Sequence, residues 1–160
     1  MVNGYMPESL AQALELMNEH ALVPYAGGTD LMVENRKGVS YLFLGKLPEL
    51  RTIGEDADYI RIGSAVTFTE AARKLRKMAE NSYAVVYITE ALASDLIPQL
   101  MKEAVSRIAA PAIRNAGTFG GNIGNGSAKA DSVLINFVAD AKLRLLSVGG
   151  ERIVEIDKFY

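Results

Sequence analysis

Two glycine-rich stretches carry the residues of this 160-residue sequence that are best suited to bind an anion. The first, YAGGTDLM, occupies residues 25–32, and the second, NAGTFGGNIGNGSAKAD, occupies residues 115–131, with glycines at 117, 120, 121, 124 and 126. A diphosphate group needs hydrogen-bond donors at close range, and consecutive backbone N–H groups in a turn or at a helix start supply them. Glycine lets such a backbone approach closely and adopt positive φ.

A threonine beside the glycines, Thr29 or Thr118, adds a hydroxyl donor to each stretch, and neither Gly-Gly core contains a lysine. The P-loop pattern GxxxxGK followed by Ser or Thr is absent, and GxGxxG does not occur in a strand–helix context. From the residues alone two interpretations stay open. The stretches are either ordinary turns or two halves of one anion site.

Composition excludes several classes of protein. Seventeen basic and 19 acidic residues give a net charge of −2 without blocks of like charge, so neither nucleic acid nor an anionic membrane is expected as a partner. The absence of cysteine excludes disulfides, a Cys nucleophile and Cys-ligated iron–sulfur clusters within this chain, and no metal site is predicted. We see no signal peptide and no apolar run approaching the roughly 20 residues of a membrane span, so a cytoplasmic location is expected.

The elements around the first glycine stretch follow from apolar spacing. A helix is expected within residues 7–20, with Pro7 in its first turn and with Leu10, Ala13, Leu14 and Met17 on one face. The runs at 21–26 and 41–45 are expected to be strands. Residues 49–56 and 59–64 flank an acidic turn and predict a hairpin.

The second half of the chain is expected to be mostly helical. Thr67 and Glu70 form a capping-box pattern that opens a helix to about Met78, and a second helix is expected from about 95 to 108, with Pro98 in its first turn. Residues 81–94 are either a strand or a helix extension. After the glycine loop we expect a helix over 131–141 and a hairpin turning at Gly149-Gly150. This order predicts the α+β class rather than a doubly wound α/β fold.

The sequence resembles a known family. AGGTDLM, together with IRNAGTFGGNI, SAKAD and ADAKLRL, is similar to the FAD-binding subunit or domain of molybdenum hydroxylases such as xanthine, carbon monoxide and nicotinate dehydrogenases. The stretches LPELRTIGED, IRIGSAVTFTE and IPQLMKEAVSRIAAPAIRN extend the similarity over nearly the whole chain. The resemblance implies a PCMH-type fold, with a small N-terminal αβ subdomain (1–55) and a larger α+β subdomain (56–160) with a mixed or antiparallel sheet. FAD is expected between them, and the second subdomain is expected to be incomplete at its C-terminus.

The resemblance also implies a set of FAD-binding residues. The first cradle for the diphosphate is expected to be Tyr25, Ala26, Gly27, Gly28, Thr29, Asp30 and Leu31, and the second Thr118, Gly121 and Asn122. Ile108 and Ala109 match positions on the flavin side, Asn125 matches a further contact, and the Asp131 carboxylate is expected to bond the flavin's sugar chain. No catalytic residue is expected, because the chemistry belongs to the flavin.

Two of these assignments have competing interpretations. Asp131 also suits the N-cap of the helix that follows the loop. Arg114 either neutralises phosphate charge or pairs with an acidic neighbour.

The resemblance implies an FAD-containing oxidoreductase subunit. In that family electrons pass from a molybdenum cofactor on a large subunit, through two [2Fe–2S] clusters on a small subunit, to FAD and on to an acceptor such as NAD⁺. The missing cysteines agree with this division, since the iron–sulfur and molybdenum ligands would lie on partners. One alternative is a non-catalytic assembly module that keeps the fold without tight FAD. A more remote alternative is a relative of flavin oxidases.

Overall fold

The structure, a computed structural model, describes residues 4–34, 36–55, 60–80 and 96–160. The segment 81–94, predicted as a strand or a helix extension, lies outside them. The described residues form helices and small sheets, which confirms the predicted α+β class. Among these residues, none of the helices has the length and apolar character needed to cross a membrane.

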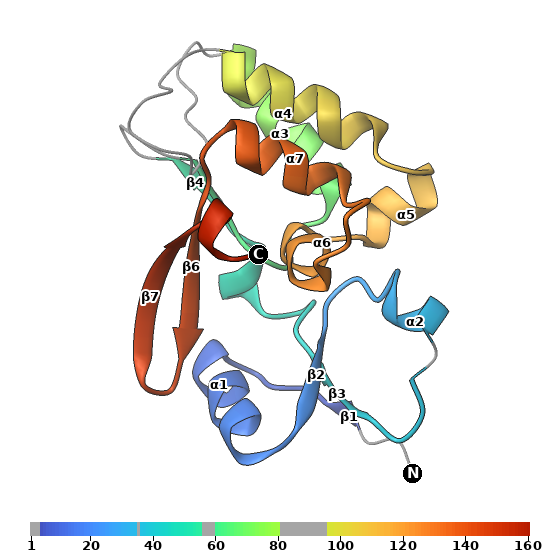
Figure 1. Ribbon diagram of the computed structural model, residues 1–160, viewed down its shortest axis with the longest axis vertical. Coiled ribbons are helices and arrows are strands. Elements are labelled where there is room, and N and C mark those ends of the chain that lie inside the picture. The colour runs from blue at the N-terminus through green and yellow to red at the C-terminus, as the bar shows by residue number, and fades with distance from the viewer. Residues whose placement is uncertain (1–3, 35, 56–59, 81–95) are drawn as a thin grey trace.

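A small parallel sheet dominates the N-terminal part, drawn in blue in Figure 1. Its strands lie in the order β1-β3-β2, and both pairs are parallel. Parallel strands need a crossover connection, and the helix between β1 and β2 supplies one. The elements are β1 (Gly4–Tyr5), α1 (Leu10–Glu19), β2 (Leu22–Tyr25), α2 (Leu31–Glu34), β3 (Ser40–Phe43) and the 3-10 helix η1 (Pro48–Arg51).

Helix α1 begins later than expected. Pro7 precedes it, because Ser9 is the N-cap residue and its Oγ accepts a hydrogen bond from the Gln12 N–H at 3.2 Å. Of the residues expected on one face, Ala13 is buried, whereas Met17 is 43% exposed. The apolar face predicted from helical spacing is therefore only partly buried.

The second part combines two antiparallel strand pairs with packed helices (Figure 1). The expected hairpins are present as β4–β5 and β6–β7. Ser147 pairs with Gly150, so the turn residues are Val148 and Gly149 rather than Gly149-Gly150. The elements are β4 (Ile53–Glu55), β5 (Ile60–Ile62), α3 (Phe68–Glu80), α4 (Leu96–Arg107), α5 (Pro111–Ala116), α6 (Phe119–Asn125), α7 (Asp131–Val138), β6 (Lys142–Ser147), β7 (Gly150–Glu155) and the 3-10 helix η2 (Ile156–Lys158).

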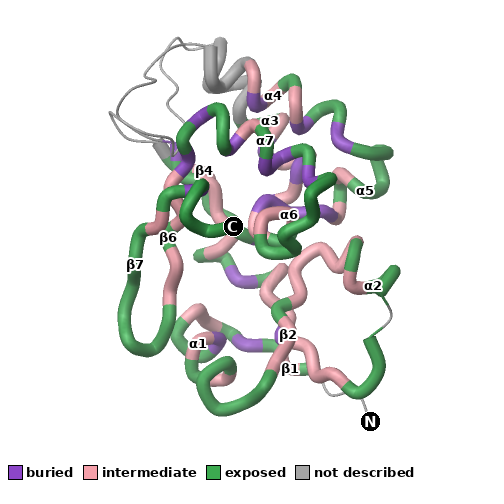
Figure 2. The backbone as a smooth tube through the Cα atoms, viewed as in Figure 1, coloured by how far each residue is buried: buried purple, intermediate pink, exposed green. Residues whose placement is uncertain are grey.

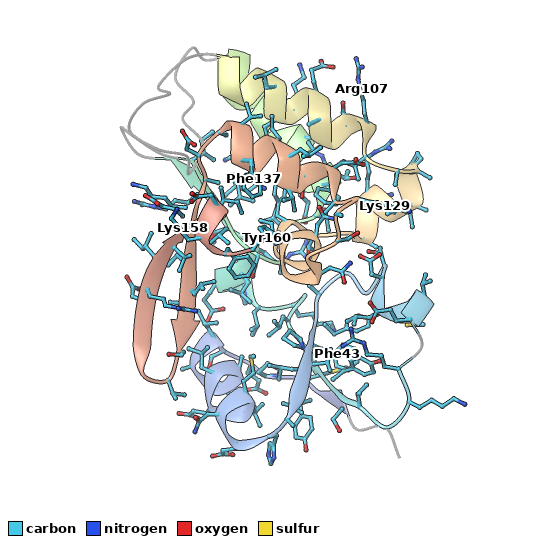
Figure 3. The ribbon with its side chains drawn as sticks, viewed as in Figure 1. Phe43, Arg107, Lys129, Phe137, Lys158 and Tyr160 are labelled. Atoms are coloured by element: carbon cyan, nitrogen blue, oxygen red, sulfur yellow. The ribbon has the colours of Figure 1, made fainter. Side chains whose placement is uncertain are left out.

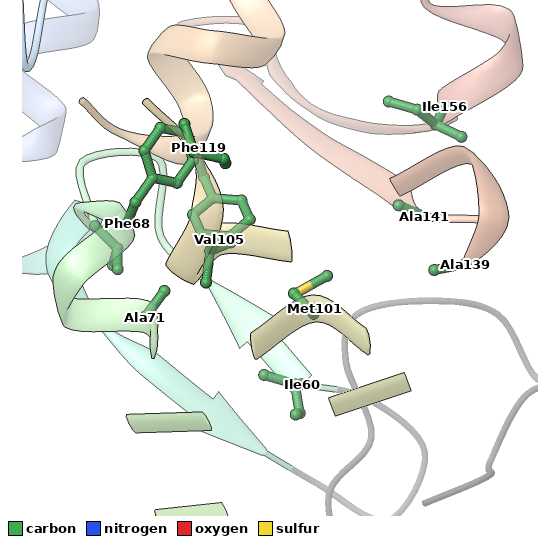
Figure 4. Close-up of a cluster of buried hydrophobic side chains, with 11 residues drawn as sticks. Ile60, Phe68, Ala71, Met101, Val105, Phe119, Ala139, Ala141 and Ile156 are labelled. Atoms are coloured by element: carbon green, nitrogen blue, oxygen red, sulfur yellow. The ribbon is translucent and has the colours of Figure 1, made fainter. Parts of the chain in front are cut away.

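One apolar core joins the helices to the strands of this second part (Figure 4). The rings of Phe68 on α3 and Phe119 on α6 lie 5.3 Å apart between centroids. Met101 and Val105 of α4 are fully buried in the same cluster, and Figure 2 shows buried positions on each of these helices. The core therefore fixes the start of α6 relative to α3. A smaller cluster of Ala13, Leu42 and Leu47 lies between α1, β3 and η1.

The predicted capping box opens helix α3. The Thr67 N–H donates to Glu70 Oε2 at 2.9 Å, and the Glu70 N–H donates to Thr67 Oγ1 at 3.2 Å. Arg51 forms an ion pair with the same carboxylate. Partial burial alone would raise the pKa of Glu70, but the hydrogen bonds from Thr67 and the Arg51 guanidinium outweigh it and hold the pKa below its ordinary value.

We expect Glu70→Ala to lower the free energy of unfolding at pH 7 by about 1 kcal/mol, the usual cost of a lost cap. A carboxylate with a lowered pKa stabilises the fold above its unfolded pKa and loses this contribution as the pH falls through the folded pKa. The difference between wild type and variant should therefore shrink below pH 4.5, the ordinary pKa of a glutamate. Urea unfolding at several pH values measures it. Glu103→Ala, at an exposed position of α4, is the control. Equal effects of the two variants would contradict the capping role.

Candidate functional site

The two glycine stretches touch each other. A Cβ on Gly27 would overlap the Ala116 carbonyl oxygen and lie 3.1 Å from the Gly117 Cα. The backbones are therefore in direct contact at this point, without a side chain between them. This contact favours the interpretation of two halves of one site over two separate turns.

A cavity of about 610 Å³ lies between the two stretches. This volume is within the range of about 300–1,000 Å³ that is usual for small-molecule sites. Of the predicted FAD-binding residues, all except Tyr25 line it, namely Ala26, Gly27, Gly28, Thr29, Asp30, Leu31, Ile108, Ala109, Thr118, Gly121, Asn122, Asn125 and Asp131. The structure thus brings together residues that are up to 105 positions apart, from 26 to 131.

Tyr25 packs inside the N-terminal part. Its ring lies 5.0 Å from that of Phe43 and 5.7 Å from that of Tyr41, between centroids. The same ring occupies the place where a Cβ on Gly28 would point. Gly28 has φ +68°, so both its conformation and its neighbour require glycine.

The first stretch supplies free backbone donors. Among the described residues, no acceptor is present for the N–H groups of residues 27–30. The carbonyls of Gly28 and Asp30 are used, accepting from Met32 and Glu34 at 2.9 Å each as α2 begins. Unpaired N–H groups need water or a ligand as partner. Several of them in sequence form a concavity that suits an anion.

The second stretch is built differently from the prediction. The sequence FGGNIGN was expected to be a loop whose N–H groups converge on an anion, but it forms helix α6. The Phe119 and Gly120 N–H groups donate to the carbonyls of Val66 and Ser64 at 3.2 and 3.0 Å, and those of Gly121 and Asn122 donate to Thr118. The prediction was wrong because a threonine cap and packing against residues 64–66 outweigh the low helix propensity of glycine.

Because these N–H groups already have acceptors, the second stretch presents side chains to the cavity and leaves open space beside Gly124. Thr118 is 4% exposed, and because its Oγ1 accepts from Gly121, its hydroxyl hydrogen is free to donate. The Ser132 hydroxyl donates a hydrogen bond to Asn122 Oδ1 and so fixes the Asn122 side chain. At Gly124 a Cβ would meet no atom within 4 Å, so the protein's own packing does not explain this glycine. A ligand that fills the space would explain it.

Two cationic residues that the sequence analysis missed, Arg36 and Lys129, line the cavity. Arg36 follows α2, and its Nε pairs with Glu34 at 2.5 Å. Lys129 lies between α6 and α7 (Figure 3). Both stand outside the Gly-Gly cores, so no local pattern pointed to them. They supply positive charge to a cavity that also contains the carboxylates of Asp30 and Asp131.

Asp131 is not a helix cap. It is the first residue of α7, and the N-cap position belongs to Ala130, which forms no side-chain cap bond. The N-cap interpretation is therefore wrong, although an acidic residue in the first turn still suits the helix dipole. The Asp131 carboxylate remains available to the cavity that it lines.

Known proteins share both the sequence and the fold. Residues 1–160 match the family described as "FAD binding domain in molybdopterin dehydrogenase". The chain is 35% identical over 159 residues to the xanthine dehydrogenase FAD-binding subunit of Escherichia coli, covering 95% of this chain and 48% of that protein. It is 31% identical over 163 residues to the nicotinate dehydrogenase FAD-subunit of Eubacterium barkeri, covering 98% and 49%. The chain thus spans about half the length of these relatives.

Solved structures agree in fold. A chain of the reconstituted CO dehydrogenase from Oligotropha carboxidovorans superposes with a TM-score of 0.80 at 24% identity, covering 98% of this chain and 51% of that chain. At this identity the likeness supports the fold, which is the predicted PCMH-type one. Together with the family match over the full sequence, it leads to one conclusion: the chain belongs to the family of FAD-binding domains of molybdopterin dehydrogenases.

Proposed function

We propose that the chain binds FAD in the cavity between residues 26–31 and helix α6, as the FAD-binding part of a molybdenum hydroxylase complex. The observation that carries this proposal is the row of N–H groups at residues 27–30, which have no acceptor among the described residues and lie on the wall of a cavity shared with Thr118 and Asn122. Backbone donors of this kind suit a diphosphate. In this assignment the first stretch holds the diphosphate and the second closes over it.

The lining fits the other parts of FAD as well. The missing side chain of Gly124 leaves room for the ligand, and Arg36 and Lys129 oppose the charge of the diphosphate. Ile108 offers an apolar wall to a ring system, and Asp131 offers an acceptor to a sugar hydroxyl. Bound FAD supplies reversible one- and two-electron chemistry, and the protein supplies position, charge and shielding.

The proposed role in electron transfer involves two partner subunits and an electron acceptor. We propose that the chain receives electrons from [2Fe–2S] clusters on a small subunit, that a large subunit holds the molybdenum cofactor, and that NAD⁺ or another acceptor takes the electrons. The names of the relatives support this role, since they are FAD subunits of xanthine and nicotinate dehydrogenases. We also propose that residues 1–55 and 56–160 form the two subdomains and that the protein is cytoplasmic.

Competition between nucleotides tests the assignment of the diphosphate. Because residues 27–30 contribute the free donors, ADP should displace FAD from the chain, whereas adenosine should not. Flavin fluorescence during the titration measures the displacement. Adenosine competing as strongly as ADP would contradict a site built around the diphosphate.

A second measurement tests the acceptor. The FAD-loaded chain, reduced under anaerobic conditions and mixed with NAD⁺, should return to the oxidised flavin spectrum with formation of NADH. Formation of NADH supports NAD⁺ as the acceptor. A reduced flavin that persists with NAD⁺ but is reoxidised by an artificial acceptor would contradict that part of the proposal.

A further inference from the structure

Arg114 lies on α5 behind the cavity wall and binds the residues that form the wall. Its Nη1 donates to the carbonyl oxygens of Ile108 at 2.8 Å and Ala109 at 2.5 Å. Its backbone N–H donates to the carbonyl of Ala110 at 3.0 Å. Three consecutive carbonyls are thus bound by one residue. Arg114 does not line the cavity, whereas Ile108 and Ala109 do.

The bound segment has an unusual backbone. Ala109 has φ +45°, in the left-handed region that a Cβ disfavours. The segment connects α4, which ends at Arg107, to α5, which begins at Pro111. A disfavoured conformation persists only where surrounding contacts hold it. The charge-assisted bonds from the guanidinium are contacts of this kind.

Neither interpretation drawn from the sequence describes Arg114. Within the described part of the chain no carboxylate pairs with it, and it lies outside the cavity where a phosphate is proposed to bind. We infer that Arg114 is a positioning residue that fixes the backbone of Ile108 and Ala109 against the flavin end of FAD. This inference rests on the proposed FAD binding and on the assignment of these two residues to the flavin side.

Paired binding measurements test the inference on the whole chain. Arg114→Leu removes both side-chain bonds, Arg114→Lys keeps the charge with fewer donors, and Arg107→Leu is the control. Arg107 is on α4 (Figure 3), its side chain is 82% exposed, and its ion pair is with Glu103. For each protein the dissociation constants of FAD and of ADP are measured together with the absorption spectrum of the bound flavin.

Arg114→Leu should weaken FAD binding about tenfold, as expected for a lost hydrogen bond to a charged group, and should leave ADP binding within about twofold. Arg114→Lys should recover part of the loss, and Arg107→Leu should change neither constant. A shift in the flavin absorption bands of Arg114→Leu would support the positioning role further, because a change in stability alone does not produce it.

Equal losses for FAD and ADP, or no loss for either, would overturn the positioning role. Circular dichroism shows whether each variant is folded. If Arg114→Leu does not fold, Arg114→Lys decides by the same comparison of FAD with ADP. A wild-type chain that binds neither nucleotide would contradict the proposed function itself, and the inference with it.

Discussion

Replacing Gly124 by valine is expected to weaken FAD binding about a hundredfold while the protein stays folded. A Cβ at Gly124 meets no protein atom within 4 Å, and the residue lines the cavity proposed for FAD. The added side chain therefore competes with the ligand rather than with the protein. Overpacking of a filled site costs about 1–3 kcal/mol, and 2.7 kcal/mol is about a hundredfold in affinity.

The stability of the Gly124→Val variant separates this account from a structural role. Valine has a higher helix propensity than glycine, so the melting temperature should not fall. Gly54→Val is the matched control: its Cβ also meets open space, and Gly54 lies in strand β4, away from the cavity lining. Gly54→Val should bind FAD like the wild type. Wild-type affinity in Gly124→Val would show that the ligand does not occupy this space.

Unlike Gly124→Val, Gly27→Ala should destabilise the protein. Its Cβ would overlap the Ala116 carbonyl and force the two stretches apart. We expect a loss of about 3 kcal/mol in the free energy of unfolding, at the upper end of overpacking effects, and a melting temperature about 10 °C lower. FAD binding should fall with it, because the two walls of the cavity meet at this contact.

Gly45→Ala is the control for this second variant. Gly45 has ordinary φ, and its Cβ would lie 3.4 Å from the Ala26 carbonyl oxygen, close to a normal contact. Alanine there should change the stability by less than about 1 kcal/mol. A Gly27→Ala variant as stable as Gly45→Ala would contradict the direct contact between the two stretches.

The sequence was informative where local chemistry decides the structure. The capping box of Thr67 and Glu70 was readable because both partners lie within one turn. The strand that ends at Tyr25 was readable from an apolar run that stops at two glycines. The cavity residues of both stretches were identified from a resemblance, and the structure brings all of them except Tyr25 to one cavity.

The sequence was misleading where contacts distant in the chain decide. Three glycines between 120 and 124 argued for a loop, but Gly120 packs against Ser64 and the segment is helical. Arg36 and Lys129 line the cavity although both stand outside the Gly-Gly cores. Arg114 was assigned a charged partner, yet its partners are carbonyls whose positions depend on the turn at Ala109. None of these contacts has a spacing that a sequence pattern records.

The most direct test is to identify the flavin bound by the chain. The chain is purified, supplied with excess FAD, freed of unbound ligand by gel filtration and denatured, and the released flavin is identified by chromatography and absorption. We expect one FAD per chain, and a loss of this FAD in Gly124→Val. A folded wild-type chain that repeatedly retains no flavin, and binds none in titration, would contradict the central claim and would favour a non-catalytic assembly module.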